Sequence, residues 1–312
     1  MYLSVIAPCY NEEEVILNFY KTLIDVIHIL NCKYEIIFID DGSEDQTLNI
    51  LKNIAKTNNY VSVISFSKNF GKESAIYAGL CESIGDYIVV MDTDLQHDPH
   101  IIPLMIDKMN EGFDTVFTRR TNRENSGLFK NFFSNLFYKV MNLLSEVEIV
   151  PGSQDFRMMS RNVVNAVISL GEYNRFSKGI FQWVGFKSTY IEVEDIKRKA
   201  GKTKWKITDL VIYAITGITS FSIKPLRMAI FLGFFLSIIS FVFIVMMFVE
   251  VLIFGIKTAG YPSIITIICF IGGIQMLLLG ILSEYTAKIF IEIKKRPLYI
   301  IKELVKNGNK VE

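Results

Sequence analysis

The first 120 residues alternate between short apolar runs and longer segments with apolar positions every three or four residues. The short runs are Leu3–Pro8, Tyr34–Asp40, Val61–Phe66, Tyr87–Asp92 and Thr115–Arg119. Their near-continuous apolar character is typical of strands buried on both faces of a largely parallel sheet. The longer segments, which have helical spacing, are Glu13–Leu30, Gln46–Lys56, Lys72–Ser83 and Ile101–Asn110. This order predicts a βαβ series and therefore an open α/β domain.

Polar clusters follow each of the first four predicted strands. They read PCYNEE, DDGSED, SKNFGK and DTDLQ in chain order. Ligands of open α/β sheets bind outside the carboxyl ends of the strands. We therefore expect these four loops to converge on one site at one edge of the sheet.

The pattern changes after Arg119. A helical stretch is predicted over about Leu128–Ser145, and Val150–Val193 is interpreted as a continuation of the same domain, which we place at residues 1–196. Residues 197–206, KRKAGKTKWK, then carry six basic side chains and no acid. Apolar positions recur at helical spacing from Ile207 to Ile218, which indicates a helix lying in a membrane interface, with a core helix of the domain as the alternative. Residues 197–227 are accordingly assigned to a basic loop and an interfacial helix.

Two longer apolar segments follow. Met228–Val249 is 22 residues without a charge and Thr258–Ser283 is 26, whereas a helix needs roughly 20 apolar residues to span a bilayer. They predict two transmembrane helices within residues 228–285 and a tail over 286–312. Basic residues flank the outer ends of this pair, and the connecting loop carries only Lys257. The positive-inside bias therefore places the domain and both termini in the cytoplasm, in a protein integral to the inner membrane.

Asp92 and Asp94 stand one residue apart directly after an apolar strand, where like charges repel unless a proton or a cation intervenes. A solvated turn, or a helix N-cap by Asp94 or Asp98, is one explanation. An EF-hand is excluded, because the loop lacks glycine at its sixth position and an acid at its twelfth. His97 and His100 lack the partners of a zinc site and are expected to be structural. A hard divalent cation bridging to the phosphates of a ligand is the remaining explanation.

The other polar clusters have structural explanations of equal weight. In DDGSED, Gly42 suits a turn and Ser43 or Asp45 could cap a helix, but neither role accounts for Asp41. Asn11 could likewise cap a helix with an acidic first turn. Neither a P-loop nor a dinucleotide-binding glycine motif is present. The four cysteines share no metal-type spacing and are expected to be reduced thiols.

Five motifs, in this order and spacing, resemble glycosyltransferase family 2: APCYNEEE, FIDDGSEDQT, NFGK, MDTDLQHDP and GSQDFRM. The later RKAGKTKW and GITSFSIKPLR, followed by two apolar segments, resemble the polyprenyl-phosphate glycosyltransferases within it. These include bactoprenol glucosyltransferases and the related dolichyl-phosphate mannose synthase. Two positions depart from the family pattern, Thr203 in place of serine and Asp98 in place of proline. The resemblance covers roughly residues 3–290 and implies a nucleotide-diphospho-sugar transferase-like fold.

The resemblance also implies roles for individual residues. Those expected to bind the nucleotide sugar are Pro8, Tyr10, Glu12, Asp41, Lys72 and Asp92. Asp92, Asp94 and Gln96 would hold Mg²⁺ or Mn²⁺ and, through it, the diphosphate. Asp155 and Arg157 would lie near the transferred sugar and the acceptor phosphate. Arg198, Lys202 and Lys204 would grip phosphate oxygens from a mobile loop, although a basic run is also typical of a lipid-headgroup surface.

The leading hypothesis is an inverting, metal-dependent transfer of a hexose, expected to be glucose, from a uridine diphosphate sugar to undecaprenyl phosphate. A lipid phosphate is already anionic near neutral pH, so a strong general base is unnecessary. One alternative is transfer to a saccharide or protein hydroxyl with Asp155 as the base, and another is a non-catalytic membrane scaffold that binds nucleotide sugars. The expected partners are the nucleotide sugar, the polyprenyl phosphate and the membrane, and no nucleic acid. Gly272 and Gly273 would permit close helix packing in a homo-oligomer.

Overall fold

The computed structural model describes residues 1–94, 96–120, 147, 150–193, 217–254, 260–306 and 309–310. Its centre is a nine-stranded sheet with the order β7-β5-β6-β4-β1-β2-β3-β8-β9. The strands are β1 (Tyr2–Cys9), β2 (Lys33–Asp40), β3 (Val61–Phe66), β4 (Tyr87–Val90), β5 (Thr115–Arg120), β6 (Ser153–Ser160), β7 (Ser188–Val193), β8 (Ile301–Lys306) and β9 (Asn309–Lys310). All five strands predicted in the first 120 residues are present, with bounds that differ by at most two residues.

The middle of the sheet is parallel, as predicted. β1 pairs in parallel with both β2 and β4, and β2 pairs in parallel with β3. The carboxyl ends of these four strands therefore lie at the same edge. β6 is inserted antiparallel between β4 and β5, and β8 runs antiparallel to β3. The fold is thus a mixed α/β sheet of the nucleotide-sugar transferase type.

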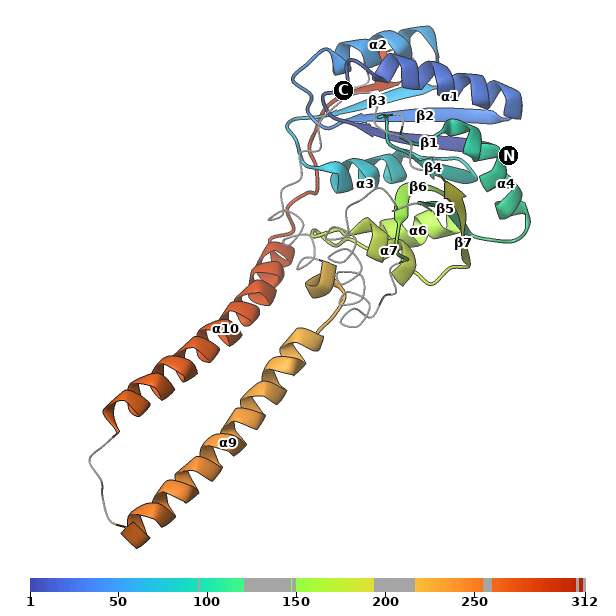
Figure 1. Ribbon diagram of the computed structural model, residues 1–312. Coiled ribbons are helices and arrows are strands. Elements are labelled where there is room, and N and C mark those ends of the chain that lie inside the picture. The colour runs from blue at the N-terminus through green and yellow to red at the C-terminus, as the bar shows by residue number, and fades with distance from the viewer. Residues whose placement is uncertain are drawn as a thin grey trace.

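Helices cover both faces of this sheet (Figure 1). One face packs against α1 (Ile16–Leu30), α2 (Thr47–Thr57) and α4 (Ile102–Asn110), the last preceded by a short 3₁₀ turn, η1 (Pro99–Ile101). The other face packs against α3 (Lys72–Glu82), α6 (Arg161–Ser169) and α7 (Ser177–Trp183). In α1 the buried residues recur every three or four positions, for example Phe19, Leu23 and Val26, so burial of one apolar stripe accounts for the helix.

Two long helices project from one side of the domain (Figure 1). α9 (Lys224–Phe254) has 31 residues and α10 (Tyr261–Ile293) has 33. At about 1.5 Å per residue each exceeds the roughly 30 Å of a bilayer core. Both are apolar enough to cross a membrane, and the apolar stretch of each is not buried within the molecule. The predicted helix over Leu128–Ser145 and most of the predicted interfacial helix lie outside the described residues.

The chain after α10 returns to the sheet, which the sequence analysis did not anticipate for its tail over residues 286–312. β8 pairs with β3, and Val305 is buried in the core beneath α2. Tyr299 stacks on Phe66 with 4.9 Å between the ring centroids. Two ion pairs of 2.7 Å, Lys52–Glu303 and Lys306–Glu82, fasten the strand on its two sides. The tail is therefore part of the α/β domain.

Candidate active site

An open pocket of about 820 Å³ lies at the carboxyl edge of the parallel strands. The predicted convergence of four loops is present, because residues from the loops after β1, β2, β3 and β4 all line this pocket. The lining residues are Pro8, Cys9, Tyr10, Glu12, Asp41, Asn69, Gly71, Lys72, Ala75, Asp92, Thr93 and Asp94. Seven residues that the family resemblance singles out are therefore brought together, from segments as far apart as Pro8 and Asp94.

The loops after β1 and β2 brace one another through hydrogen bonds. Asn11, which has a left-handed backbone with φ of 55°, accepts through its side-chain oxygen from the Glu44 N–H at 2.9 Å. The Asn11 N–H donates to the Ser43 hydroxyl at 3.0 Å. Asn11 therefore does not cap α1, contrary to one alternative raised by its sequence. Asp45 accepts from the Thr47 N–H at 2.9 Å just before α2, but the N-cap residue of α2 is Gln46, so this bond closes a turn and does not cap the helix.

Asp41 holds the loop that leads into α3. Its two carboxylate oxygens accept from the Phe70 and Gly71 N–H groups at 2.7 and 2.9 Å. Burial raises the pKa of Asp41, and the two N–H donors oppose that rise. Asp41 thereby fixes the backbone just ahead of Lys72, and each of its oxygens keeps a lone pair for a ligand in the pocket.

Lys72, at the start of α3, joins two carboxylates from different strands. Its ammonium nitrogen lies 2.6 Å from Asp92 Oδ1 and 2.6 Å from Asp155 Oδ2. Asp92 follows β4, whereas Asp155 lies on β6, the antiparallel neighbour of β4. The antiparallel insertion of β6 thus delivers Asp155 to the pocket edge. Lys178 of α7 approaches the other oxygen of Asp155 at 3.8 Å.

The three groups of this bridge are all charged near neutral pH. Burial lowers the pKa of the Lys72 ammonium, but Asp92 and Asp155 outweigh burial and hold it above its ordinary value. Burial likewise raises the pKa of both carboxyl groups, but Lys72 and the other positive or hydrogen-bonding neighbours together outweigh it and hold both below the usual range. Lys178 and Arg157 lower the pKa of Asp155 further. Asp155 is consequently a carboxylate, and it would not begin a reaction as a proton donor.

Asp94 lines the pocket, while its neighbours have structural partners. Asp94 Oδ1 accepts from the Gln96 N–H at 3.1 Å, and Asp98 accepts from the His100 N–H at 3.0 Å, which caps η1. The Gln96 side-chain oxygen accepts from Arg120 at 3.2 Å, and Gln96 is not among the pocket-lining residues. His97 is buried against Phe156, and its Nε2 lies 3.7 Å from Asp92 Oδ2.

The donor set of the pocket suits a hard cation supplied with a phosphate ligand. Among the described residues, no group of three or more His, Cys, Asp and Glu side chains is placed to hold a metal ion. Mg²⁺ is commonly bound through only one or two carboxylates together with substrate phosphates. Asp92 and Asp94 line the same pocket and meet that requirement. A cation on Asp92 would share this carboxylate with the Lys72 ammonium.

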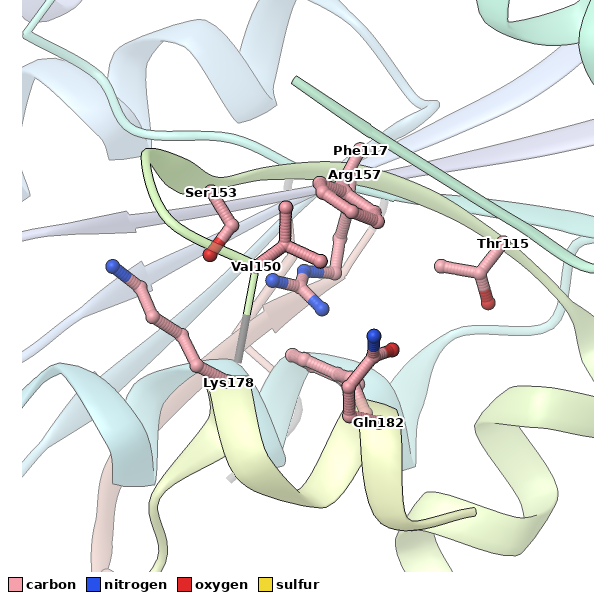
Figure 2. A pocket seen from close by; sticks show the side chains of 8 residues that line it. Thr115, Phe117, Val150, Ser153, Arg157, Lys178 and Gln182 are labelled. Atoms are coloured by element: carbon pink, nitrogen blue, oxygen red, sulfur yellow. The ribbon is translucent and has the colours of Figure 1, made fainter. Parts of the chain in front are cut away.

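A second, smaller pocket of about 310 Å³ lies between β6 and α7 (Figure 2). Arg157 from the strand and Gln182 from the helix turn their polar ends toward one another, while the Lys178 ammonium extends to the left in this view. The Arg157 guanidinium lies over the Phe181 ring at 3.9 Å and donates to the Gln154 carbonyl at 3.2 Å. Arg157 is only 4% exposed and is not among the residues that line the larger pocket. Lys178 lines this smaller pocket and faces Asp155, which contacts Lys72 of the larger pocket.

Several residues around this site have no signal in the sequence. Lys178 and Ser177 carry no motif, and the Ser177 hydroxyl contacts the carboxylate of Glu73, the neighbour of Lys72. Only the topology, which places α7 beside α3 and β6, brings them to the site. Three predicted site residues, Arg198, Lys202 and Lys204, lie outside the described part of the chain.

Comparison with known proteins agrees with the motifs. The model of the family "Glycosyl transferase family 2" matches residues 4–168. A putative glycosyltransferase of Bacillus subtilis is 42% identical over 301 residues, which are 96% of this chain and 91% of that protein. A prophage bactoprenol glucosyl transferase homolog of Escherichia coli is 41% identical over 309 residues, 98% of this chain and 100% of that protein. Glucosyl-3-phosphoglycerate synthase from Mycobacterium tuberculosis, solved with Mn²⁺ and uridine-diphosphate-glucose, is 18% identical with a TM-score of 0.44 and covers 70% of this chain and 77% of that one.

Proposed function

The chain belongs to glycosyl transferase family 2, and on this premise we propose that it transfers glucose from a uridine diphosphate sugar to a polyprenyl phosphate at a membrane surface. The observation that carries the proposal is the pocket in which Asp92 and Asp94 meet the loops that follow β1, β2 and β3. The sugar and the lipid follow the names of relatives that match nearly the whole chain, such as the bactoprenol glucosyl transferase homolog. The uridine diphosphate donor follows the resemblance of the motifs.

The donor would bind along the four loops. Pro8, Tyr10 and Glu12 form the wall nearest β1 and would contact the base and ribose, with Asp41 beside them. Asp92 and Asp94 would hold Mg²⁺ or Mn²⁺, which when bound neutralises charge on the diphosphate. The Lys72 ammonium lies beside them and offers a second positive charge to the leaving group.

The acceptor supplies its own nucleophile. An oxygen of the lipid phosphate would form a bond to C1 of the sugar while the bond from C1 to the diphosphate oxygen breaks, and the electron pair leaves with the nucleoside diphosphate. Attack from the opposite face inverts the configuration at C1. The phosphate oxygen is already anionic, so no residue needs to remove a proton. Asp155 would instead stay ionised beside the reacting sugar, where it can stabilise positive charge at C1.

The long helices would hold this site at the height of the lipid headgroup. α9 and α10 would span the bilayer, with the domain and both termini on the cytoplasmic side. The exposed residues Lys294, Lys295 and Arg296 at the end of α10 support this orientation. A polyprenyl phosphate in the same membrane would then present its headgroup to the domain without leaving the bilayer.

The proposal is tested by sugar transfer with the purified full-length protein in bilayers that contain polyprenyl phosphate. With labelled uridine diphosphate glucose and Mn²⁺, the label is expected in the organic extract, in a product whose mass equals lipid phosphate plus one hexose. Label on a water-soluble saccharide or on protein would instead show a hydroxyl acceptor. No turnover with a broad panel of donors and acceptors would favour a non-catalytic role.

A further inference from the structure

Three consecutive residues of α7 make three different connections. The Ser177 N–H donates to Glu73 of α3 at 3.1 Å. Lys178 faces Asp155 of β6 at 3.8 Å. Gly179 lies against Phe221, in the segment that precedes α9. One short helix thus connects the carboxylate beside the reacting sugar with the entrance to the membrane helices.

The contact at Gly179 is unusually close. A Cβ atom built on Gly179 would lie 2.5 Å from Phe221 Cε2 and 2.8 Å from Phe176 Cδ1. The Phe221 and Phe176 rings lie against one another with 6.2 Å between their centroids. Glycine inside a helix is about 1 kcal/mol less favourable than alanine. Because the Phe221 ring occupies the space that a Cβ atom would need, there is a physical reason for glycine at this position.

The segment that carries Phe221 is fastened to α10. The Tyr285 hydroxyl donates to the Ser222 carbonyl at 2.6 Å. The Lys288 ammonium donates to the Ser220 hydroxyl at 3.0 Å. Both neighbours of Phe221 are therefore held by the second long helix, and the ring occupies a fixed place at the base of the helical pair.

We propose that Phe221 is a positioning residue that seats α7 so that Lys178 faces Asp155. This proposal rests on the proposed function, in which Asp155 lies beside the reacting sugar, and it adds a route from the membrane helices to that carboxylate. The route runs from α10 through Ser220 and Ser222 to the Phe221 ring, then through Gly179 to Lys178. Displacement of the ring would move the Lys178 ammonium and alter the charge balance at Asp155.

The first test uses Gly179→Ala in the full-length protein in bilayers. The added methyl group displaces the ring, and a shift of about 1 Å at a catalytic group can cost up to about 100-fold in rate. We expect the transfer rate to fall about 10- to 100-fold with an unchanged KM for the nucleotide sugar. Gly171→Ala is the matched control, because a Cβ at Gly171 meets no atom within 4 Å. Equal rates for the two variants would overturn the proposal.

A double-mutant cycle separates positioning from general packing. If Gly179→Ala acts through Lys178, it should have little further effect in a Lys178→Met background, because the group it displaces is already absent. If the double variant instead loses rate by the product of the two single effects, the Phe221 ring acts on the fold as a whole and not through Lys178. That result would contradict the proposal even if both single variants are slow.

A third measurement does not depend on turnover. Hydrogen–deuterium exchange of the α7 amides should become faster in Phe221→Ala, while the amides of α4 serve as the reference. Unchanged exchange in α7 would overturn the proposal, whatever the enzyme transfers. Absence of sugar transfer by the unmutated protein, with faster exchange in α7, would instead refute the proposed function and leave the physical link in place.

Discussion

The ammonium group of Lys72 lies 2.6 Å from a carboxylate oxygen of Asp155, although the two residues are 83 positions apart. Lys72 begins α3, and Asp155 lies on the strand inserted antiparallel beside β4. The same ammonium contacts Asp92. One ammonium group therefore joins Asp92, which lines the larger pocket, to Asp155 on β6.

Lys72→Met should slow transfer strongly, because it removes this cation and keeps the length of the side chain. Two carboxylates would then face each other across the site without their shared counter-charge. Loss of one preorganised charged group commonly costs about 100- to 1,000-fold in rate, and we expect a fall in that range. Lys56→Met, at an exposed position near the end of α2, controls for the loss of a positive charge. The measurement is the initial rate of sugar transfer by each variant. Similar rates for Lys72→Met and Lys56→Met would argue against a role for the contacts of Lys72 with Asp92 and Asp155.

Asp155 should make stability depend on pH in the acidic range. Lys72, Lys178 and Arg157 overcome burial and hold the pKa of its carboxyl below the usual range. The stabilisation is therefore complete above the ordinary carboxyl pKa of about 4 and is lost as the pH falls below it. The gap in unfolding temperature between the unmutated protein and Asp155→Asn should be steady above about pH 5 and narrow below about pH 4. Asp107→Asn, at an exposed position on α4, controls for the removal of a charge; a gap for Asp155→Asn that widens on acidification would contradict the assignment.

Asp94→Asn should lower both the transfer rate and the binding of Mn²⁺. If Asp94 supplies one of the two carboxylates that bind the metal ion, its loss should reduce the transfer rate by at least about 100-fold, as for other groups that stabilise developing charge. Mn²⁺ binding in the presence of uridine diphosphate, followed by electron paramagnetic resonance, should weaken in parallel. Chelation should abolish transfer, and added Mg²⁺ or Mn²⁺ should restore it. Asp98→Asn is the control because its carboxylate caps η1, and full activity in Asp94→Asn would refute the metal role.

Gly42→Ala should disturb the pocket as well as the fold. Gly42 has φ of 70°, and a Cβ there would lie 2.5 Å from the backbone carbonyl carbon of Lys68, in the loop after β3. The left-handed backbone alone costs an L-residue roughly 1–2 kcal/mol. Gly112 also has a left-handed backbone, with φ of 91°, but a Cβ atom there would meet no atom within 4 Å, so Gly112→Ala is the control. We expect both variants to lose stability, and Gly42→Ala to lose more than Gly112→Ala. Only Gly42→Ala should raise the KM for the nucleotide sugar. Equal KM values for the two variants would show that the close approach of Gly42 to Lys68 does not shape the pocket.

Val305→Ala should destabilise the α/β domain, because β8 completes the sheet beside β3. Val305 is 5% exposed, and removing two buried carbon groups costs about 2 kcal/mol. Ile300→Ala, at a side chain that is 52% exposed, should change the free energy of unfolding by less than about 0.5 kcal/mol. Denaturation of both variants in the same detergent provides the comparison. Equal stability would mean that the returning strand adds little to the sheet.

The sequence predicted the parallel part of the fold well, because its signals there are local. Apolar runs closed by polar loops define β1 to β5, and the family motifs mark the loops that line the pocket. The start of α1 was less predictable: helical spacing begins at Glu13, but the helix begins at Ile16, after residues that are bonded to the loop beyond β2. The local spacing of apolar residues carries no information about a hydrogen bond between two loops.

The remaining features depend on distant pairing. Asp155 and Arg157 belong to a family motif, but their placement follows from the antiparallel insertion of β6 beside β4. Lys178 has no sequence signal, since its partner lies on another element. The return of the tail to the sheet has no local signal, because β8 is short and its partner, β3, ends more than 230 residues earlier. Such contacts are determined by the assembled sheet and have no counterpart in spacing along the chain.

The returning strand also has a consequence for biosynthesis. β3 is made early on the ribosome, whereas β8, which covers its outer edge, is made only after both long helices have been synthesised. An incomplete chain therefore exposes the outer edge of β3 for the whole time that α9 and α10 are being translated. Completion of the α/β domain is thus tied to prior synthesis of α9 and α10, so that a molecule truncated before α10 is finished would leave that edge open to chaperones and proteases.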